Sequence, residues 1–461
     1  RRRPCALRRA RRPRIRRLWR VSEDFSRFLA AVEADPRIEL HSVVALHRGR
    51  PVVEAYWAPW RSTDSVGVYS VSKTVTGSAV GIAIGEGRFG LHDRVAALID
   101  PARPVDERIA ELTVHHLLSM STGHSADPDW YDGEDPVDHF FIAVPQEPVG
   151  SRHAYNNLAS WMLGELVRRR TGESLMDYLR PRLFEPLGIE PSWETDEQGR
   201  ELGFTGLHVT TTELARLGEL YRLGGSWQGR QVIPADYVAQ AGRRQIPTNP
   251  DDDRDWTTGY GYQVWISREG YRLDGAFGQF CLVLPEREAV IALTSAQAPT
   301  SQPLLDLVFE HLVPAVTGGD AIAVSTPLQL APAPDSGEPG PWWADALEAR
   351  SERTVDLRDV RLARAGEGWR LSATLDGRPG GLTAPGAGWH RPRSGDGATL
   401  PVAISAGVAE GTGRILLAFT DTVHTLQLDL RQGEGTQAWR TTPLSPPPVA
   451  ELITGPATPP A

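Results

Sequence analysis

Lysine is almost absent from this chain: Lys73 is the only one in 461 residues, whereas arginine occurs 48 times. Cysteine is scarce as well, with only Cys5 and Cys281, so neither a disulfide framework nor a cysteine metal cluster can be built. No run of apolar residues is long enough to span a bilayer. We therefore expect a cytoplasmic protein without a membrane segment, a bound metal or a cofactor.

The first twenty residues hold eleven arginines and no acidic residue. Such a segment is typical of a nucleic-acid-binding arm, a targeting peptide or a disordered extension, and we favour the disordered extension. The remaining 441 residues carry 38 basic and 58 acidic residues. This acidic balance argues against a nucleic-acid surface on the folded part, and a small molecule is the expected partner. The oligomeric state stays open.

Length and composition predict one large domain followed by a smaller one. With 40% apolar and 23% charged residues, the composition is that of a soluble globular protein. We place the large domain at residues 21–320, a proline-rich linker at 321–341, a small β-rich domain at 342–445 and a disordered tail at 446–461. The linker assignment rests on Ala331-Pro332-Ala333-Pro334, and the β-rich assignment rests on strand-like runs between Gly/Asp turns.

Hydrophobic periodicity predicts the main elements of the large domain. The expected strands span residues 39–47, 52–57, 279–284 and 289–295, and the expected helices span 22–34, 71–84, 158–170 and 304–312. A hairpin near each end of the domain, with helices between, indicates one antiparallel sheet that is joined from both ends and covered by helices. The fold class is therefore α/β (α+β).

The lone lysine stands three residues after Ser70, and positions i and i+3 share one face of a helix. Arginine stays charged at any accessible pH, whereas a partly buried lysine can lose its proton and act as a base. A serine beside such an amine is an activated nucleophile. The alternative is chance, because 26 serines in 461 residues would put one at this spacing about one time in eighteen.

Two other patterns carry less weight. The glycines from Gly85 to Gly90 formally match the dinucleotide-binding fingerprint, but they follow a predicted helix and more plausibly end it. His115 and His116 are adjacent, and neighbouring side chains on a helix point about 100° apart, so the two are no natural metal pair. The acidic and aromatic stretch at residues 127–138 is expected to form a loop over a cleft.

A hydrolase built on Ser70 and Lys73 also needs a proton shuttle and a site for the oxyanion. Tyr155 and Asn157, at the start of a predicted helix, can supply a phenol and an amide. A nearby cation favours the phenolate form, so Lys73 would lower the pKa of Tyr155, which would then accept the proton of Ser70. Taken alone, each residue is more simply explained as a helix-entry residue.

Together these motifs resemble the serine β-lactamase and penicillin-binding protein superfamily. The resemblance rests on Ser70-Val71-Ser72-Lys73, on Tyr155-Asn156-Asn157 and on a glycine-bearing turn before the last hairpin. Residues 116–123 (HLLSMSTG) and 206–214 (GLHVTTTEL) add to it, and the nearest likeness is the class C-like branch of β-lactamase-related esterases and D-aminopeptidases. The resemblance implies a catalytic helix buried between an all-helical region and the sheet.

The third motif of the superfamily, usually Lys-Thr-Gly or His-x-Gly, falls on Asp274-Gly275-Ala276-Phe277-Gly278. An aspartate stands where a cation would bind a substrate carboxylate, which favours a neutral or cationic substrate over a β-lactam. The backbone at Gly275, Ala276 and Phe277 can still donate an N–H to an oxyanion together with the N–H of Ser70. The glycines permit the close backbone approach that this requires.

These expectations define a serine acyl hydrolase that acts on an ester or a small amide. The resemblance implies that Ser70 attacks the carbonyl, that Tyr155 activates the water that releases the product, and that Lys73 sets the protonation of both. Asn157 would orient Lys73 and the substrate carbonyl. The alternatives are a β-lactamase or D-amino-acid peptidase, and a catalytically silent binding module. An α/β-hydrolase is excluded because no Gly-x-Ser-x-Gly elbow occurs.

Overall fold

The structure is a computed structural model that describes residues 23–125, 127, 135–318, 328–338, 340–353, 355–375, 378–392 and 401–444. The arginine-rich segment at 1–20 and the tail at 446–461 lie outside the described residues. Within the described ranges, no helix is long and apolar enough to cross a membrane.

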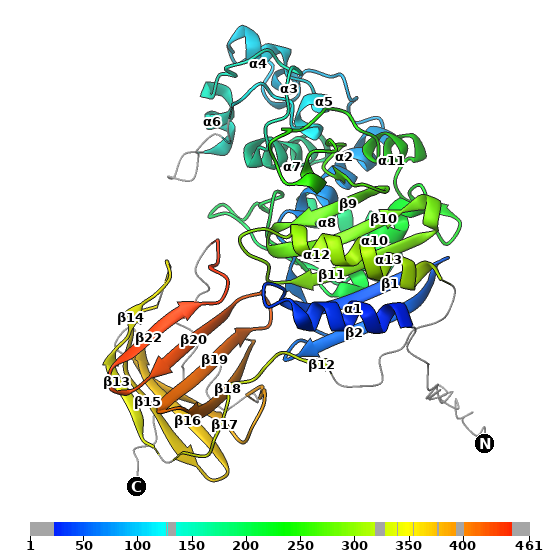
Figure 1. The fold of residues 1–461 in the computed structure, drawn as a ribbon. Helices are drawn as coiled ribbons and strands as arrows, with labels where there is room; N and C mark the ends of the chain where they lie inside the picture. Colours follow the sequence, from blue (N-terminus) through cyan, green and yellow to red (C-terminus); the bar gives the residue numbers. More distant parts are fainter. Residues whose placement is uncertain are drawn as a thin grey trace, which may run out of the picture.

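A seven-stranded sheet forms the centre of the larger part, in the order β12-β2-β1-β11-β10-β9-β8 (Figure 1). Its strands are β1 Leu40–His47, β2 Arg50–Ala58, β8 Trp265–Ile266, β9 Tyr271–Gly275, β10 Gln279–Leu284, β11 Ala289–Ser295 and β12 Leu328–Gln329. The hairpin β1–β2 meets the hairpin β10–β11 through antiparallel pairing of β1 with β11. The predicted sheet, joined from both ends of the domain, is therefore confirmed.

Helices cover both faces of this sheet. One face carries α1 Glu23–Ala34, α12 Gln302–Leu307, the π-helix Val308–Leu312 and α13 Val313–Thr317, with Phe25 and Phe28 buried against the strands (Figure 1). The other face carries α10 Thr211–Arg222, which lies against β1, β10 and β11, and α2 Val71–Gly85, which lies against β9. Helix α7 Asn157–Thr171 packs against α2 among the helices above the sheet. The predicted helix at 304–312 thus ends in a π-helical turn rather than continuing as one α-helix.

Helix α2 is buried along nearly its whole length. Every residue from Val71 to Ala83 is buried. Its glycines allow this enclosure, because a Cβ atom at Gly81 would lie 2.5 Å from Cδ1 of Tyr237, closer than carbon atoms approach without a shift. As predicted for a central helix, α2 lies against α7 on one side and against strand β9 on another.

The remaining helices form a region above the sheet (Figure 1). They are α3 Val95–Ile99, α4 Glu107–Glu111, α5 Val114–Leu118, α6 Pro136–Ile142, α8 Leu175–Leu179, the π-helix Arg180–Phe184, α9 Glu185–Leu187 and α11 Ala235–Ala241. A three-stranded sheet, β3-β5-β4, completes this part with the strands β3 Val66–Gly67, β4 Ser192–Trp193 and β5 Leu207–Val209. Strand β3 leads directly toward Ser70.

The C-terminal part consists of two five-stranded sheets that share one apolar core. The first has the order β17-β16-β15-β13-β21, and the second has the order β14-β22-β20-β19-β18 (Figure 1). The strands are β13 Trp342–Ala346, β14 Glu348–Ala349, β15 Leu357–Ala365, β16 Gly368–Leu375, β17 Arg378–Ala384, β18 Val402–Ala409, β19 Thr412–Phe419, β20 Thr425–Leu430, β21 Gln432–Gly433 and β22 Gly435–Trp439. The all-β character expected for this part is present.

The segment predicted as a linker is attached to both parts of the molecule where it is described. Strand β12 lies within it and pairs in parallel with β2, through Leu328 opposite Trp57. Further on, the backbone N–H of Ala333 donates to Oγ of Ser405 on β18 at 3.0 Å. Proline-rich composition alone did not reveal these contacts, because a two-residue strand leaves no periodic pattern.

Candidate active site

Ser70 lies at the junction between strand β3 and helix α2. Just before it, the N–H of Val68 donates to the carbonyl oxygen of Leu207 at 2.9 Å, which fixes the incoming backbone. Tyr69 then adopts a left-handed conformation with φ of 48°, and Ser70 is the N-cap residue of α2. The backbone turn therefore leaves the Ser70 hydroxyl at the first turn of a helix that is otherwise buried.

Lys73 lies one turn further along α2, and its side chain is almost fully enclosed, with 1% of the residue exposed. Its Nζ donates to Oγ of Ser70 at 3.0 Å, to Oδ1 of Asn157 at 2.7 Å and to the carbonyl oxygen of Phe204 at 2.9 Å. Burial lowers the pKa of Lys73 to about 7, against an opposing influence from the charge of Asp127. Near neutral pH, an appreciable fraction of this amine is therefore free to accept a proton.

Asn157 is the first residue of helix α7, and this position brings its side chain to Lys73. Asn156 caps this helix, since its Oδ1 accepts from the N–H of Ala159 at 2.9 Å. The N–H of Asn157 donates to Oδ1 of Asp127 at 2.8 Å, so the backbone is anchored while the amide side chain faces Lys73. The two asparagines of the motif thus have different roles: Asn156 caps helix α7, and Asn157 contacts the amine of Lys73.

Tyr155 is stacked on Trp265, with 5.9 Å between ring centroids, and its hydroxyl is hydrogen-bonded to Ser70. Lys73 Nζ lies 4.8 Å from the centre of the Tyr155 ring. Burial raises the pKa of Tyr155 well above its usual value, and the charges of Asp274 and Asp127 add to this effect. The phenolate expected from the sequence is therefore not the resting form, because the effect of desolvation exceeds that of the hydrogen bond with Ser70, which lowers the pKa.

The end of strand β9 lies directly against the segment that leads to Ser70. A Cβ atom at Gly275 would come within 2.3 Å of the carbonyl oxygen of Val68, so only glycine permits this approach. Gly278 has φ of 81°, and a Cβ atom there would lie 2.4 Å from Oγ of Ser295. Gly275 therefore permits the close approach of β9 to the segment before Ser70, and Gly278 permits the turn that follows Phe277.

Asp274 has a partner that sequence reasoning missed. Arg272 Nε donates to Oδ2 of Asp274 at 2.8 Å, and the side chains are 0% and 11% exposed. Burial raises the pKa of Asp274, and the charge of Arg272 opposes that rise. Strand alternation could have indicated this pair, because residues i and i+2 point to the same face of a strand.

A hollow of about 390 Å³ opens beside the end of β9. The residues from Asp274 to Phe277 line it, together with Asp252, Asp253 and Thr300. Since Asp274 is paired with Arg272, the exposed carboxylates of Asp252 and Asp253 give the rim its negative charge.

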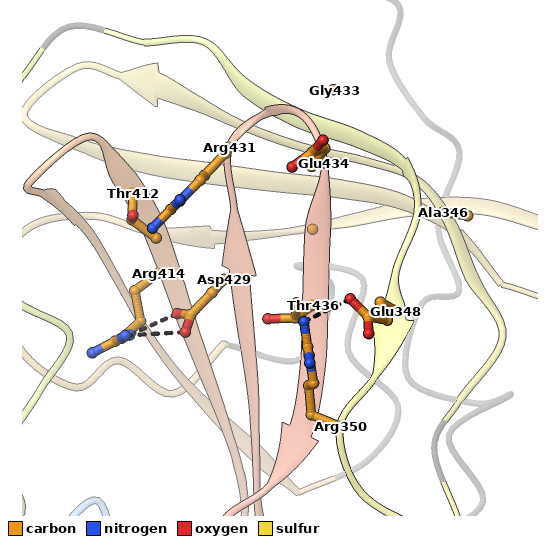
Figure 2. Close-up of a pocket in the computed structure, with 11 residues that line it drawn as sticks. Ala346, Glu348, Arg350, Thr412, Arg414, Asp429, Arg431, Gly433, Glu434 and Thr436 are labelled. Carbon is orange, nitrogen blue, oxygen red and sulfur yellow. Dashed lines mark hydrogen bonds and ion pairs between the residues drawn. The ribbon is translucent and has the colours of Figure 1, made fainter.

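A larger hollow, of about 650 Å³, lies on the C-terminal sheets and is lined only by residues of the C-terminal part (Figure 2). Four of its charged side chains form two pairs: Arg414 Nε donates to Asp429 at 2.7 Å, and Arg350 donates to Glu348 at 2.7 Å (Figure 2). These two pairs neutralise four of the charges that line the hollow, and the other two charged side chains, Arg431 and Glu434, are of opposite sign. The hollow therefore carries no excess of one charge. Among the described residues, no group of three or more His, Cys, Asp or Glu side chains is arranged to hold a metal ion.

Three groups at the site were not found from the sequence: Asp127, the carbonyl of Phe204 and Arg272. Asp127 comes from the stretch expected to form a loop over a cleft, of which residues 128–134 lie outside the described residues. The Phe204 carbonyl reaches Lys73 across 131 positions. A backbone acceptor this distant carries no residue type that could have marked it.

Comparison with known proteins supports the resemblance to serine β-lactamases and penicillin-binding proteins. Residues 25–312 match the model of the family described as Beta-lactamase. Penicillin-binding protein 4 of Amycolatopsis lactamdurans is 27% identical over 360 residues, covering 68% of this chain and 90% of that protein. The 6-aminohexanoate-dimer hydrolase of Paenarthrobacter ureafaciens is 25% identical over 289 residues, covering 54% and 71%. The structure of SurE with D-Leu shares the fold over 89% of this chain and 98% of its own, at 19% identity and a TM-score of 0.51.

Proposed function

Because the chain belongs to the Beta-lactamase family, a family of serine hydrolases, we propose that it hydrolyses an ester or a small amide through an acyl-enzyme on Ser70. One observation carries this proposal: Lys73 Nζ lies 3.0 Å from Ser70 Oγ while burial lowers the pKa of Lys73 to about 7. An amine with this pKa is well matched to general-base chemistry near neutral pH.

In the acylation step, neutral Lys73 accepts the proton of Ser70 as Oγ bonds to the substrate carbonyl carbon. Tyr155, held as a neutral phenol by its raised pKa, gives its proton to the leaving group as the ester or amide bond breaks. The resulting phenolate is stabilised by protonated Lys73, whose Nζ lies 4.8 Å from the ring centre. In deacylation, the phenolate takes a proton from water, which attacks the acyl carbon, and Lys73 returns the proton to Ser70.

The negative charge that develops on the carbonyl oxygen needs donors that are already in place. We assign this role to the backbone N–H groups of Ser70 and Ala276. Two observations support the assignment: Ser70 is the N-cap residue of α2, and Gly275 brings the end of β9 against the Val68 carbonyl. Asn157 holds Lys73 through its Oδ1, which accepts a hydrogen bond from Nζ at 2.7 Å.

The substrate we propose is neutral or carries a cation. The rim carboxylates of Asp252 and Asp253 favour a positive group and oppose a free carboxylate. The name of the relative from Paenarthrobacter ureafaciens, a 6-aminohexanoate-dimer hydrolase, fits an amide with an amino end. The relative called penicillin-binding protein 4 favours a second candidate, a β-lactam or D-peptide substrate. Because Asp274 is paired with Arg272, its charge opposes the carboxylate of such a substrate less than the sequence alone suggests.

A fluorophosphonate probe tests the proposal, because it forms a covalent bond with an activated serine. We expect wild-type protein and the control variant Ser62→Ala to be labelled, since Ser62 is exposed and lies outside the site. Ser70→Ala should not be labelled. Equal labelling of Ser70→Ala, or no labelling of the wild type, contradicts the proposal. Faster turnover of a chromogenic cephalosporin than of p-nitrophenyl esters would favour the second candidate.

A further inference from the structure

A histidine of the C-terminal part contacts the active-site region directly. His424 lies between strands β19 and β20, and its ring reaches both Tyr69 and Phe277. Tyr69 immediately precedes Ser70, and Phe277 immediately follows Ala276. The two residues therefore flank the two backbone N–H groups assigned to the oxyanion, and one side chain from another part of the chain touches both.

The hydrogen bond between Tyr69 and His424 has a defined direction. Nδ1 of His424 lies 2.9 Å from the carbonyl oxygen of Thr441, which can only accept, so Nδ1 carries a proton. Burial lowers the pKa of His424 to about 4, so the ring is neutral at physiological pH and Nε2 is an acceptor. Tyr69 accordingly donates its hydroxyl proton to Nε2 over 2.7 Å.

The contact with Phe277 is made by ring packing. The centroids of the Phe277 and His424 rings are 4.9 Å apart at an angle of 86°, an edge-to-face arrangement. Phe277 also lies edge-on to Tyr69, with centroids 5.2 Å apart. The three rings thus form one cluster, in which His424 is the member from the C-terminal part.

Both active-site members of this cluster have strained backbones. Tyr69 has φ of 48° and Phe277 has φ of 62°, values that bulky side chains rarely adopt. Such conformations persist only where the surrounding structure holds them. The N–H of Ser70 belongs to the peptide plane that follows Tyr69, and the peptide plane that follows Ala276 leads into Phe277. Holding Tyr69 and Phe277 in place therefore also holds the backbone beside the two N–H donors.

The loop that carries His424 is itself fixed to the larger part of the molecule. The N–H of Gly67 donates to the carbonyl oxygen of Asp421 at 2.9 Å, and Nε1 of Trp60 donates to that of Thr422 at 3.2 Å. Val423 is fully buried in a small apolar cluster with Trp60 and Val66. His424 therefore presents a rigid acceptor to Tyr69 rather than a mobile one.

We propose that His424 is a positioning residue of the active site, which holds Tyr69 and Phe277 in place and so aligns the two oxyanion N–H donors. The C-terminal part would then complete the catalytic site instead of being an independent appendage. The effect on catalysis rests on the proposed function, whereas the contacts of His424 with Tyr69 and Phe277 do not.

The direct test is steady-state kinetics of His424→Leu, which removes the acceptor and the ring. Because misplacing an oxyanion donor affects the transition state more than the bound substrate, we expect kcat to fall about 10- to 100-fold and KM to stay within about twofold. Tyr69→Phe should lose a similar part of kcat, and adding it to His424→Leu should cause little further loss. His424→Gln, whose side-chain oxygen can still accept from Tyr69, should recover part of the activity.

Arg391→Gln is the matched control. Arg391 joins the two parts elsewhere, since Nη1 donates to Oδ1 of Asp64 at 2.7 Å, and it makes no contact with Tyr69 or Phe277 among the described hydrogen bonds and ring contacts. This variant should keep kcat within about twofold of the wild type. A folded His424→Leu protein with unchanged kcat, or an equal loss in Arg391→Gln, would overturn the positioning role.

A second measurement separates this inference from the proposed function. In ¹⁵N-labelled protein, histidine NMR should show His424 at neutral pH as the Nδ1–H tautomer, with an Nε2 shift that changes in Tyr69→Phe. If the wild type hydrolyses no ester or amide but this signature is present, the proposed function is wrong and the hydrogen bond from Tyr69 to His424 is confirmed. An Nε2–H tautomer, or no response to Tyr69→Phe, refutes the contact.

Discussion

Lys73 donates a hydrogen bond from Nζ to Oγ of Ser70 over 3.0 Å, in a site where only 1% of Lys73 is exposed. The amine and hydroxyl are therefore in contact before any substrate arrives, and water does not screen them. Burial disfavours the charged ammonium and brings the pKa of Lys73 to about 7. The same enclosure that makes the lysine costly to charge makes it useful as a base.

The first prediction concerns the dependence of activity on pH. Lys73 accepts a proton only in its neutral form, so kcat/KM should rise as the pH increases through about 7 and then level off. Because burial raises the pKa of Tyr155 well above its usual value, no fall due to loss of the phenol proton should occur up to about pH 10. A rate profile from pH 5 to 10 checks both limbs, and a profile that falls between pH 6 and 8 contradicts the base role.

The second prediction concerns replacement of the amine. Lys73→Arg keeps a permanent charge and Lys73→Met removes it, so neither variant can accept the Ser70 proton. We expect each to lose about 10²- to 10⁴-fold in kcat, the usual contribution of a general base. Steady-state kinetics measures this loss, and circular dichroism of both variants serves as the folding control. Activity of Lys73→Met within a few-fold of wild type would show that another group accepts the proton.

The third prediction concerns stability. With a pKa of about 7 when folded and 10.5 when unfolded, Lys73 binds fewer protons in the folded chain across this window. The free energy of unfolding should therefore rise with pH from about 7 to 10, and below pH 7 the destabilisation from the buried charge is complete. Relative to Lys73→Met, the wild type should gain about 2–3 kcal/mol between pH 7.5 and 9.5. Parallel urea titrations of the two proteins measure the difference, and a constant difference across this range contradicts the lowered pKa.

The fourth prediction compares two aspartates of the hollow. Asp274→Asn leaves the fully buried Arg272 without its charge partner and should lower the free energy of unfolding by about 3–5 kcal/mol. Asp253→Asn alters an exposed rim charge and should change stability by less than about 0.5 kcal/mol.

The same rim variant tests substrate preference. Asp253→Asn should reduce the preference for an ammonium-bearing ester over a carboxylate-bearing ester about two- to five-fold, as expected for one exposed charge. Ratios of kcat/KM for the matched esters measure this preference. If the ratio is unchanged in Asp253→Asn, the rim carboxylate does not influence the substrate, and the charge argument is wrong.

Much of the fold was predictable because its signals are local. The strands expected at 279–284 and 289–295 coincide with β10 and β11, and the helix expected at 71–84 is α2, one residue longer. At the site, Ser70 and Lys73 share a helix face, so their contact follows from spacing alone. Asn157 could be placed with them only through the order of motifs along the chain.

The rest depends on contacts that leave no local pattern. His424 meets Tyr69 across 355 positions, and neither residue belongs to a motif that names the other. Arg272 belongs to no motif, so the sequence marks Asp274 as a lone charge although its partner stands two residues earlier on the same face of the strand. The prediction of a phenolate at Tyr155 was wrong for a related reason. The sequence shows a nearby cation but does not show how deeply the phenol is buried.

The most direct test of the account is to trap the acyl-enzyme. Wild-type protein mixed with a p-nitrophenyl ester and quenched in acid within the first turnovers should gain the mass of one acyl group, and peptide mapping should place it on Ser70. Ser70→Ala should gain none under the same conditions. An acyl group on another residue, or turnover of the ester by Ser70→Ala at the wild-type rate, would contradict the central claim that Ser70, activated by Lys73, is the nucleophile.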